Sequence, residues 1–385
     1  DGWTGQARAS LSRLERASTS GLDTPDAYQV RAEAYAQIGR PASARKAYRG
    51  LLGVRPTDER ARRALRQIDR TLRPTIEIGG DASVQSGDPT RNKVTSAVVP
   101  VRVRVHPAGG DAALTVSASM ASFENARGTS QDRMVGLGVD APLGNRWRVL
   151  GDATRHEFDR AQPTVTGRGE VLFAPHDRVE LRLGGAREQL FSSRMSLAGE
   201  DRDGVFYGPS FSSEILAGAT LHPTRRWDIW TRTMLGRTRG DHLADNTHHK
   251  VFAGAGRALS VGASTVRVGY ALAWMAYRLD LGGFPPADLA GNGVSSRGVG
   301  GYFSPFAFWN HAARVDATVP LGDVATLVGG AGLGRQSVRD ALTQGTDARP
   351  SSDAYLGVRV LAGPRVSLSG QVDHQNVASA FDRTT

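Results

Sequence analysis

The side chains most able to do chemistry are spread along the chain instead of forming a readable motif. His248 and His249 are adjacent, but neighbouring residues of a strand point to opposite faces, which argues against a shared metal ion. We interpret the pair as an exposed loop end. The sequence has no cysteine, so thiolate nucleophiles, thiolate metal sites and disulfides are excluded. Four acidic residues lie in strand-like segments without a spacing that suits acid–base catalysis: Asp81, Glu170, Asp228 and Asp316. We therefore expect no catalytic residue, no metal and no cofactor.

Composition and charge exclude further classes. The 385 residues carry a formal net charge of +10, and 39% of them are hydrophobic. No run approaches the roughly 18 apolar residues of a transmembrane helix. The arginines are scattered through strand-like segments and form no basic patch, so no nucleic-acid partner is expected. The chain begins at Asp1 with neither methionine nor signal peptide, and we interpret it as part of a longer protein.

Residues 1–72 show the 3.6-residue period of helices. With Pro56 at the last signature position of a tetratricopeptide repeat, six more positions fall into register: Tyr28, Ala32, Tyr35, Ala44, Tyr48 and Leu51. Residues 5–18 match the second helix of a preceding repeat, and residues 58–72 match a closing helix. Because one repeat cannot bury its own core, we predict that residues 1–72 end a longer repeat array. The alternative is a helical hairpin that only packs on the next domain.

After Pro74 the period changes to two, and about fifteen strands are predicted, with no helix among them. In the segment Thr265–Arg278, apolar side chains such as Val266 and Val268 alternate with Arg267 and Gly269. A strand of this kind suits a soluble sandwich, whose polar face meets water. It equally suits an outer-membrane barrel, whose apolar face meets lipid and whose polar face lines a lumen.

The connections decide between these two classes. Short turns rich in Gly, Pro and Asn alternate with longer polar loops, and the turns lie at 106–110, 142–145, 175–177, 223–225, 260–263, 321–323 and 362–364. The longest loops are expected at 192–212, 239–247, 280–305 and 337–353. Outer-membrane barrels have short periplasmic turns and long external loops, whereas a soluble sandwich has no reason to alternate.

We therefore predict a mainly β protein: a 16-stranded antiparallel outer-membrane β-barrel over residues 73–385, preceded by periplasmic helices. Single-chain bacterial barrels have even strand numbers. The sixteenth strand is consequently expected beyond Thr385, unless one strand around 204–222 has been missed.

Some polar or aromatic residues lie on the strand face that would line the lumen, and these are the candidate contacts for its contents: Arg102, Arg104, Arg168, Arg182, Asp228, Trp230, Arg232 and Tyr277. The two aromatic members could stack on sugar rings or simply fill the lumen. The loop 280–305, which contains Phe284, is the candidate gate, and Tyr302, Phe303 and Pro305 are expected to pack its return against the wall. Four aromatic residues lie near strand ends and, by the alternation, on the lipid-facing side of their strands: Trp147, Phe173, Trp227 and Trp274. We expect them to form a girdle at the membrane interface.

The segment Gly300-Gly-Tyr-Phe-Ser-Pro305 follows a glycine-rich loop and resembles a motif of the BcsC-type proteins, the outer-membrane secretion family of cellulose synthesis. The family's motif continues with Gln and a second aromatic, whereas here Phe306 replaces the Gln, and Phe308-Trp309 supply aromatics. The resemblance implies an outer-membrane channel that exports a biofilm exopolysaccharide, cellulose first of all. Its implied partners are the polysaccharide, outer-membrane lipid, and the periplasmic and inner-membrane cellulose synthase components.

Other functions stay open at this point. The chain could export another glycan, such as poly-N-acetylglucosamine or an acidic polysaccharide, which an arginine-rich lumen would favour. It could also be a plugged barrel that serves as a phage receptor or adhesin. A soluble β-rich hydrolase is the third alternative, and the alternating connection lengths argue against it.

Overall fold

The computed structural model describes residues 6–18, 24–85, 94–125, 128–190, 194–202, 204–281, 302–322, 324–339, 346–361, 363 and 366–376. The chain comprises two units, Asp1–Glu188 and Gln189–Thr385. Within the described residues, no helix is both long and apolar enough to span a membrane.

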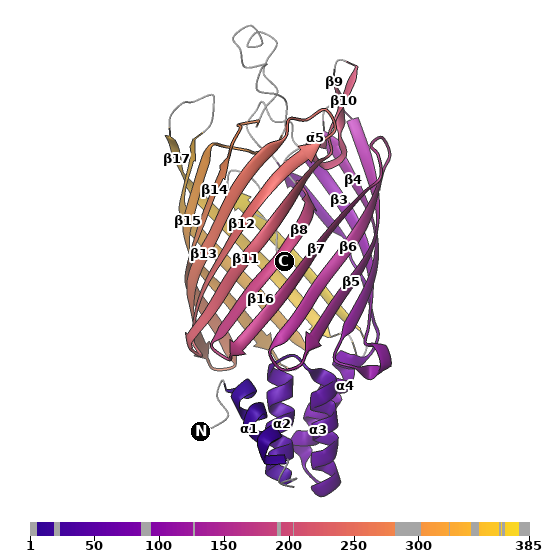
Figure 1. The fold of residues 1–385 in the computed structure, drawn as a ribbon, viewed down its shortest axis with the longest axis vertical. Helices are drawn as coiled ribbons and strands as arrows, with labels where there is room; N and C mark the ends of the chain where they lie inside the picture. Colours follow the sequence, from indigo (N-terminus) through magenta and orange to yellow (C-terminus); the bar gives the residue numbers. More distant parts are fainter. Residues whose placement is uncertain are drawn as a thin grey trace. The chain divides into compact units, whose positions relative to one another are not determined.

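Helices α1 (Ala7–Ser18), α2 (Pro25–Gln37), α3 (Pro41–Val54) and α4 (Glu59–Leu72) open the first unit (Figure 1). Proline begins α2 and α3, where its missing N–H costs no helical hydrogen bond. The Thr24 hydroxyl caps α2 by accepting from the Ala27 N–H, and the Asp58 carboxylate caps α4 by accepting from the Ala61 N–H. The helical prediction for this segment is therefore confirmed.

Helices α2, α3 and α4 share one apolar core, built from Ala32, Ala44, Ala47, Tyr48, Leu51, Ala61, Ile68 and Leu72. Ala32 and Ala44 are fully buried, and such small side chains let α2 and α3 approach closely. Tyr35 packs against this core and also against the cluster around Leu11 of α1. Four residues of this core are positions that the repeat signature selects, namely Ala32, Ala44, Tyr48 and Leu51, while the assignment to a tetratricopeptide array stays a prediction.

The strands of the first unit follow directly after the helices. They are β1 (Thr75–Ile78), β2 (Asp81–Gln85), β3 (Val94–Val105), β4 (Ala113–Asn125), β5 (Gly128–Leu143), β6 (Trp147–Phe158), β7 (Thr164–His176) and β8 (Val179–Gln189). From β3 to β8 each strand pairs antiparallel with the next. β1 and β2 both pair with β3, so they act as one strand over 75–85 that is interrupted at Gly79-Gly80.

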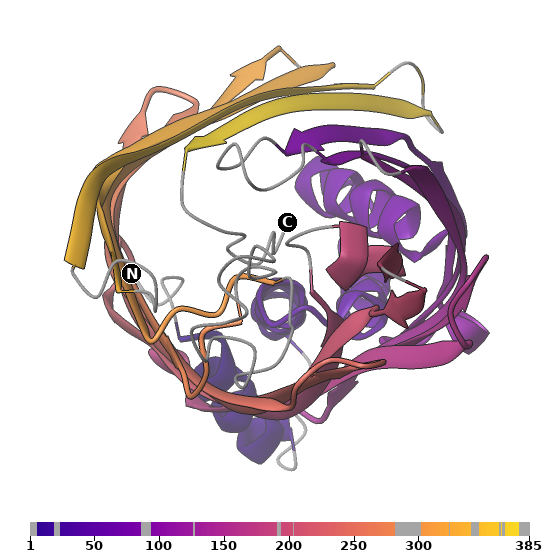
Figure 2. The same ribbon diagram turned by 90° about the horizontal axis from the view of Figure 1, so that it is seen from above.

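The second unit continues the same pattern. Its long strands are β11 (Ser210–Thr224), β12 (Trp227–Gly240), β13 (Asn246–Val261), β14 (Ser264–Tyr277), β15 (Ala307–Leu321), β16 (Ala325–Arg339), β17 (Thr346–Leu361) and β18 (Ser367–Asn376). Each pairs antiparallel with the next, and the later strands, orange to yellow in Figure 2, curve around one side of the unit. A short helix α5 (Arg194–Ala198) and a hairpin of β9 (Glu200–Arg202) and β10 (Val205–Tyr207) precede β11.

The long strands belong to one 16-stranded antiparallel sheet. Since β1 and β2 share the neighbour β3, the sheet order has fifteen successive positions, the number that the sequence predicts. A further strand beyond Thr385 would lie outside this chain, and residues 377–385 lie outside the described residues.

Three expectations about the connections are wrong. A short helix, α5, and a 3-10 turn at Pro107–Gly109 occur among the strands, where no helix is expected. The segment 192–212 holds α5, the β9–β10 hairpin and the start of β11 instead of one plain loop. The segment 337–353 is largely strand, because β16 runs to Arg339 and β17 begins at Thr346. Polar residues continue these strands because one face of such a sheet can stay wet.

Candidate functional site

Both units have one apolar and one polar sheet face. In the first unit, large apolar side chains on one face are exposed: Val101, Leu114, Val116, Val135, Leu137, Val139, Val165, Val171, Leu181 and Leu183. In the second unit the same holds for Ile215, Ile229, Leu235, Val268, Tyr270, Val315, Leu333, Leu356 and Val358. Apolar side chains exposed on this scale require an apolar surrounding such as lipid. The candidate site is therefore the opposite, polar face.

Aromatic residues lie at the ends of the apolar face. In the first unit Trp147, at the turn end of β6, stacks on Phe173 of β7 with 4.2 Å between ring centroids. In the second unit Trp227 lies at the turn end of β12. Trp274 lies near the other end of β14, away from the turn, and its ring centroid is 5.9 Å from that of Trp309. These positions suit the interfacial girdle expected from the sequence, which stays a prediction.

On the polar face of the first unit the charges are paired. Glu170 of β7 is 3% exposed, and its carboxylate accepts from Arg168. Arg182 of β8 lies 3.4 Å from the same carboxylate and donates to Glu180 at 3.1 Å. A carboxylate so deeply buried would be strongly destabilising without its cationic partners. The pairs therefore hold Arg168 and Arg182 in place on the polar face.

The other two candidate arginines of the first unit also face carboxylates. Arg104 of β3 donates to Asp140 of β5 at 3.2 Å, and Arg102 lies 4.0 Å from Glu77 of β1. Both arginine side chains are about half exposed. All four candidate arginines of this unit thus lie within ion-pair distance of an acidic residue, while retaining contact with solvent.

The candidates of the second unit lie on β12 and β14. Asp228 forms an ion pair with Arg267 of β14. Trp230 and Arg232 are partly buried, and each has a glycine opposite it on one neighbouring strand: Gly254 of β13 for Trp230 and Gly218 of β11 for Arg232. This unit also contains polar contacts between residues that the sequence analysis did not connect. Arg314 pairs with Asp353 at 3.0 Å, and the Tyr355 hydroxyl donates to Asp316 at 3.0 Å.

Tyr277, Tyr302 and Phe303 lie in an apolar cluster with Met275, Leu281 and Phe308. Tyr302 is 1% exposed, and burial raises the pKa of its hydroxyl. The rings of Tyr277 and Tyr302 are 6.2 Å apart, and those of Phe303 and Phe308 meet edge to face at 5.6 Å. Tyr277 is therefore buried in this cluster and is not open on the polar face. Phe284 lies outside the described residues.

Backbone hydrogen bonds fix both ends of the 278–305 connection. The Ser304 hydroxyl accepts from the Leu281 N–H at 2.8 Å, and the Tyr277 N–H donates to the Pro305 carbonyl at 3.0 Å. Asn246, at the start of β13, accepts from the Leu279 N–H at 2.9 Å and donates to the Leu279 carbonyl at 2.7 Å. We call Asn246, Tyr302, Phe303 and Ser304 the loop anchor.

His248 is not the exposed loop end that the sequence suggests. It lies within β13, 5% exposed, with Nε2 2.9 Å from a carboxylate oxygen of Glu214 on β11. Lys250 donates to the same oxygen at 2.5 Å. The intervening strand β12 carries Gly236 at this level, where a Cβ would lie 2.6 Å from His248, so the missing side chain makes room for the pair. Among the described residues no group of three or more His, Cys, Asp or Glu could hold a metal ion.

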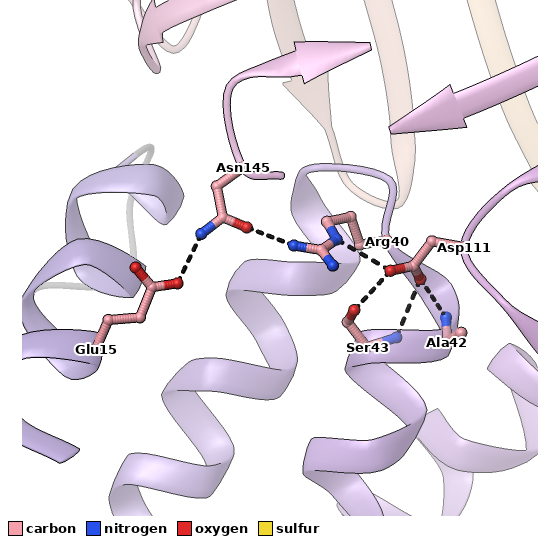
Figure 3. Close-up of polar contacts among 6 residues, drawn as sticks. All are labelled: Glu15, Arg40, Ala42, Ser43, Asp111 and Asn145. Atoms are coloured by element: carbon pink, nitrogen blue, oxygen red, sulfur yellow. Dashed lines mark hydrogen bonds and ion pairs between the residues drawn. The ribbon is translucent and has the colours of Figure 1, made fainter. Parts of the chain in front are cut away.

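In the first unit the helices contact the strand turns through Asp111, which precedes β4 (Figure 3). Its carboxylate accepts from the backbone N–H groups of Ala42 and Ser43 at 2.7 and 3.0 Å, and from the Ser43 hydroxyl at 2.5 Å. Arg40 donates to it at 3.0 Å. Burial alone would raise the pKa of Asp111, but these hydrogen bonds and the Arg40 charge lower it below its ordinary value. A turn of the sheet thereby caps the N-terminus of α3.

Two further turns make similar contacts in this unit. Asn145, between β5 and β6, accepts from Arg40 at 2.7 Å and donates to Glu15 of α1 at 2.8 Å (Figure 3). Asp177, between β7 and β8, accepts from the backbone N–H of Arg8 at 3.1 Å, which lies in the first turn of α1. Helices α1 and α3 are thus both held at their N-termini by aspartates of strand turns.

The chain is similar to several solved structures. The chain is similar to a bacterial polysaccharide outer membrane secretin, with a TM-score of 0.54 and 12% identity over 78% of this chain and 90% of that chain. It is also similar to a loop L8 deletion mutant of OmpT, an outer membrane protein of Vibrio cholerae, with a TM-score of 0.40 and 7% identity over 74% and 99% of the two chains. For BamA from Haemophilus ducreyi lacking POTRA domains 1–3, the TM-score is 0.40 and the identity 11%, over 84% and 76%.

The exposed apolar face, the antiparallel sheet and the first of these similarities define the class: the protein is an outer-membrane β-barrel with helices before its first strand. Residues 82–344 match the family described as cellulose synthase operon protein C C-terminus, and the chain belongs to this family. The protein is located in the outer membrane, and its function is polysaccharide export. None of the curated proteins matches the sequence.

Proposed function

We propose that the protein exports cellulose from the periplasm to the cell exterior through the lumen of its barrel, and that it catalyses no reaction on the polymer. In a barrel the face opposite to the lipid lines the lumen. On this proposal Arg102, Arg104, Arg168, Arg182, Asp228, Trp230 and Arg232 belong to the wall along which the chain moves, while Tyr277 stiffens that wall.

The family match carries the choice of cellulose, and the pairing of charges on the polar face supports a neutral glycan over an acidic one. Each of the four candidate arginines of the first unit faces a carboxylate, for example Glu170 for Arg168 and Asp140 for Arg104. An acidic polysaccharide would meet these carboxylates as well as the arginines. A neutral polymer instead meets many weak donors and acceptors, which allow it to bind and to leave again.

The two parts of the chain have different roles in this proposal. Residues 1–72 are the end of a periplasmic tetratricopeptide-repeat array, and residues 73–385 are the barrel. The repeats contact the periplasmic and inner-membrane cellulose synthase components that deliver the polymer, and no nucleic acid is involved. The connection 280–305, which includes Phe284, gates the external end. The loop anchor, together with Pro305, holds the base of this gate.

Single-channel conductance in a planar bilayer tests the proposal. The purified chain should give a steady current that cellohexaose interrupts, with blockades that lengthen as longer cello-oligosaccharides are used. Maltohexaose, which has the same composition but α-linkages and a coiled shape, is the matched control and should block more weakly. Blockade by an acidic oligosaccharide such as oligogalacturonate without blockade by cellohexaose would change the substrate. A chain that inserts but never conducts would favour a plugged receptor or adhesin.

A further inference from the structure

The first unit contains a cavity of about 430 Å³ between its helices and the turn ends of its strands. Five of its lining residues come from the strand side: Arg104, His106, Asp111, Asp140 and Arg148. The helices line it with Tyr48 of α3 and with Gln67 and Thr71 of α4, among others. Because Arg104 also belongs to the polar face of β3, the cavity adjoins that face at the end where the helices lie.

The strand side of the cavity holds hydrogen-bond donors in fixed positions. Arg148 of β6 donates to both carboxylate oxygens of Asp140 at 2.7 Å, and Arg104 donates to one of them at 3.2 Å. Both arginine side chains remain 40% or more exposed. A guanidinium carries five N–H donors, so the two groups keep donors for a ligand after these three bonds. Their pairing with Asp140 limits their motion and makes the site pre-organised.

Acceptors and an aromatic ring complete the cavity. The Nδ1 atom of His106 is buried and has no hydrogen-bond partner in the described part of the chain. Gln67 and Thr71 add amide and hydroxyl groups from α4, and Tyr48 adds an aromatic side chain from α3. Sugar hydroxyls both donate and accept, so a wall that mixes donors, acceptors and one ring suits a saccharide.

Glycine at the bend between α2 and α3 lets the helices come close to Arg148. Gly39 has a φ of +73°, a conformation that residues with a Cβ rarely adopt. A Cβ at this position would lie 3.3 Å from a terminal nitrogen of the Arg148 guanidinium. The bend therefore borders the cavity without a side chain that would cover the donors of Arg148.

We propose that this cavity is a binding site for a neutral saccharide chain, which it holds before the chain enters the lumen. The inference rests on the proposed export function and adds a site to it. The pairing of charges in the wall favours a neutral ligand, because Asp111 pairs with Arg40, and Asp140 pairs with Arg104 and Arg148. The bound chain would accept from Arg104 and Arg148 and would exchange hydrogen bonds with Gln67 and Thr71.

The test uses sided addition of cellohexaose to the full chain in a planar bilayer. The substitution Arg104→Gln removes one guanidinium and leaves the Arg148–Asp140 pair in place. Loss of a hydrogen bond from a charged donor should lower the blocking rate from the helix side about tenfold. Blocking from the opposite side should stay the same. Ala64→Trp, which fills the cavity from α4, should act in the same direction.

Arg155→Gln is the matched control, because Arg155 lies on β6, is 63% exposed and pairs with Glu157 away from the cavity. It should leave blocking from both sides unchanged. Equal losses from both sides in Arg104→Gln would assign Arg104 to the lumen wall and overturn the cavity site. Unchanged blocking in both cavity variants would also overturn it, while the export proposal would survive. A wild-type chain that cellohexaose does not block would overturn both.

Discussion

Removal of the Asp111 carboxylate should release the N-terminus of α3 from the strand turns. Arg40, the residue before Pro41, makes no capping hydrogen bond with its own side chain, so Asp111 supplies the cap from the β3–β4 connection. A lost N-cap costs about 0.5–2 kcal/mol, and a hydrogen bond to a charged group contributes about 1.5–3 kcal/mol. Because the carboxylate side chain is only 12% exposed, solvent replaces these contacts poorly.

We therefore expect Asp111→Ala to weaken the contact between helices and turns by about 2–4 kcal/mol. Hydrogen exchange of the Ala42 and Ser43 amides in the full chain should then accelerate by about 30- to 700-fold, since 1.4 kcal/mol corresponds to a factor of ten. Asp111→Asn should give a smaller effect, because its amide oxygen still accepts but carries no charge for Arg40. The strands should keep their protection.

Asp26→Ala is the control for this prediction. Asp26 lies in the first turn of α2, is 79% exposed, and pairs only at the surface with Arg55. Its removal should leave exchange at Ala42 and Ser43 unchanged, as surface ion pairs contribute little. If Asp111→Ala exchanges like the wild type at these two amides, capping by the strand turn is refuted.

Three more outcomes are expected. The pKa of Asp111 is lowered in the folded chain, so its stabilising contribution should be complete above the ordinary pKa of 3.8 and should be lost as the pH falls through the folded pKa. Hydrogen exchange of the α3 amides, corrected for the intrinsic exchange rate at each pH, checks this. Asn246→Ala should expose the Leu279 backbone bonds and cost about 1–3 kcal/mol, measured as faster exchange at 278–281 with unchanged exchange in β16. Glu170→Gln should remove the negative charge that pairs with Arg168 and Arg182. The reversal potential of the channel under a salt gradient should then shift toward anion selectivity. An unshifted potential would contradict the placement of these two arginines on the lumen wall.

The strands could be predicted from the sequence because their signal is local. Alternation such as that of Val266 and Arg267 fixes which residues share a face, and the Gly/Pro-rich turns fix where strands end. Prediction failed where polar residues continue a strand, as at the end of β16. A strand whose residues contact water on both faces shows no alternation of apolar and polar side chains, so the sequence pattern does not mark it. The β9–β10 hairpin has three-residue strands, too short to show a period.

The contacts that shape the site were less predictable. Asn246 binds Leu279 across 33 residues, and Asp111 binds Ser43 across 68, so neither pair has a sequence signature. His248 was misassigned because its partner Glu214 lies two strands away. One signal was available for Asp111: the sequence before Pro41 lacks the Ser, Thr, Asp or Asn that usually caps a helix, which indicates a cap from elsewhere.

Efflux from proteoliposomes tests the central claim most directly. Vesicles with the inserted chain would be loaded with equal amounts of fluorescently labelled cellohexaose and oligogalacturonate of the same length, and release of each would be followed over time. A conduit for a neutral glycan should release cellohexaose faster than the acidic oligomer, and vesicles without protein should retain both. Retention of cellohexaose together with rapid release of the acidic oligomer would contradict the claim.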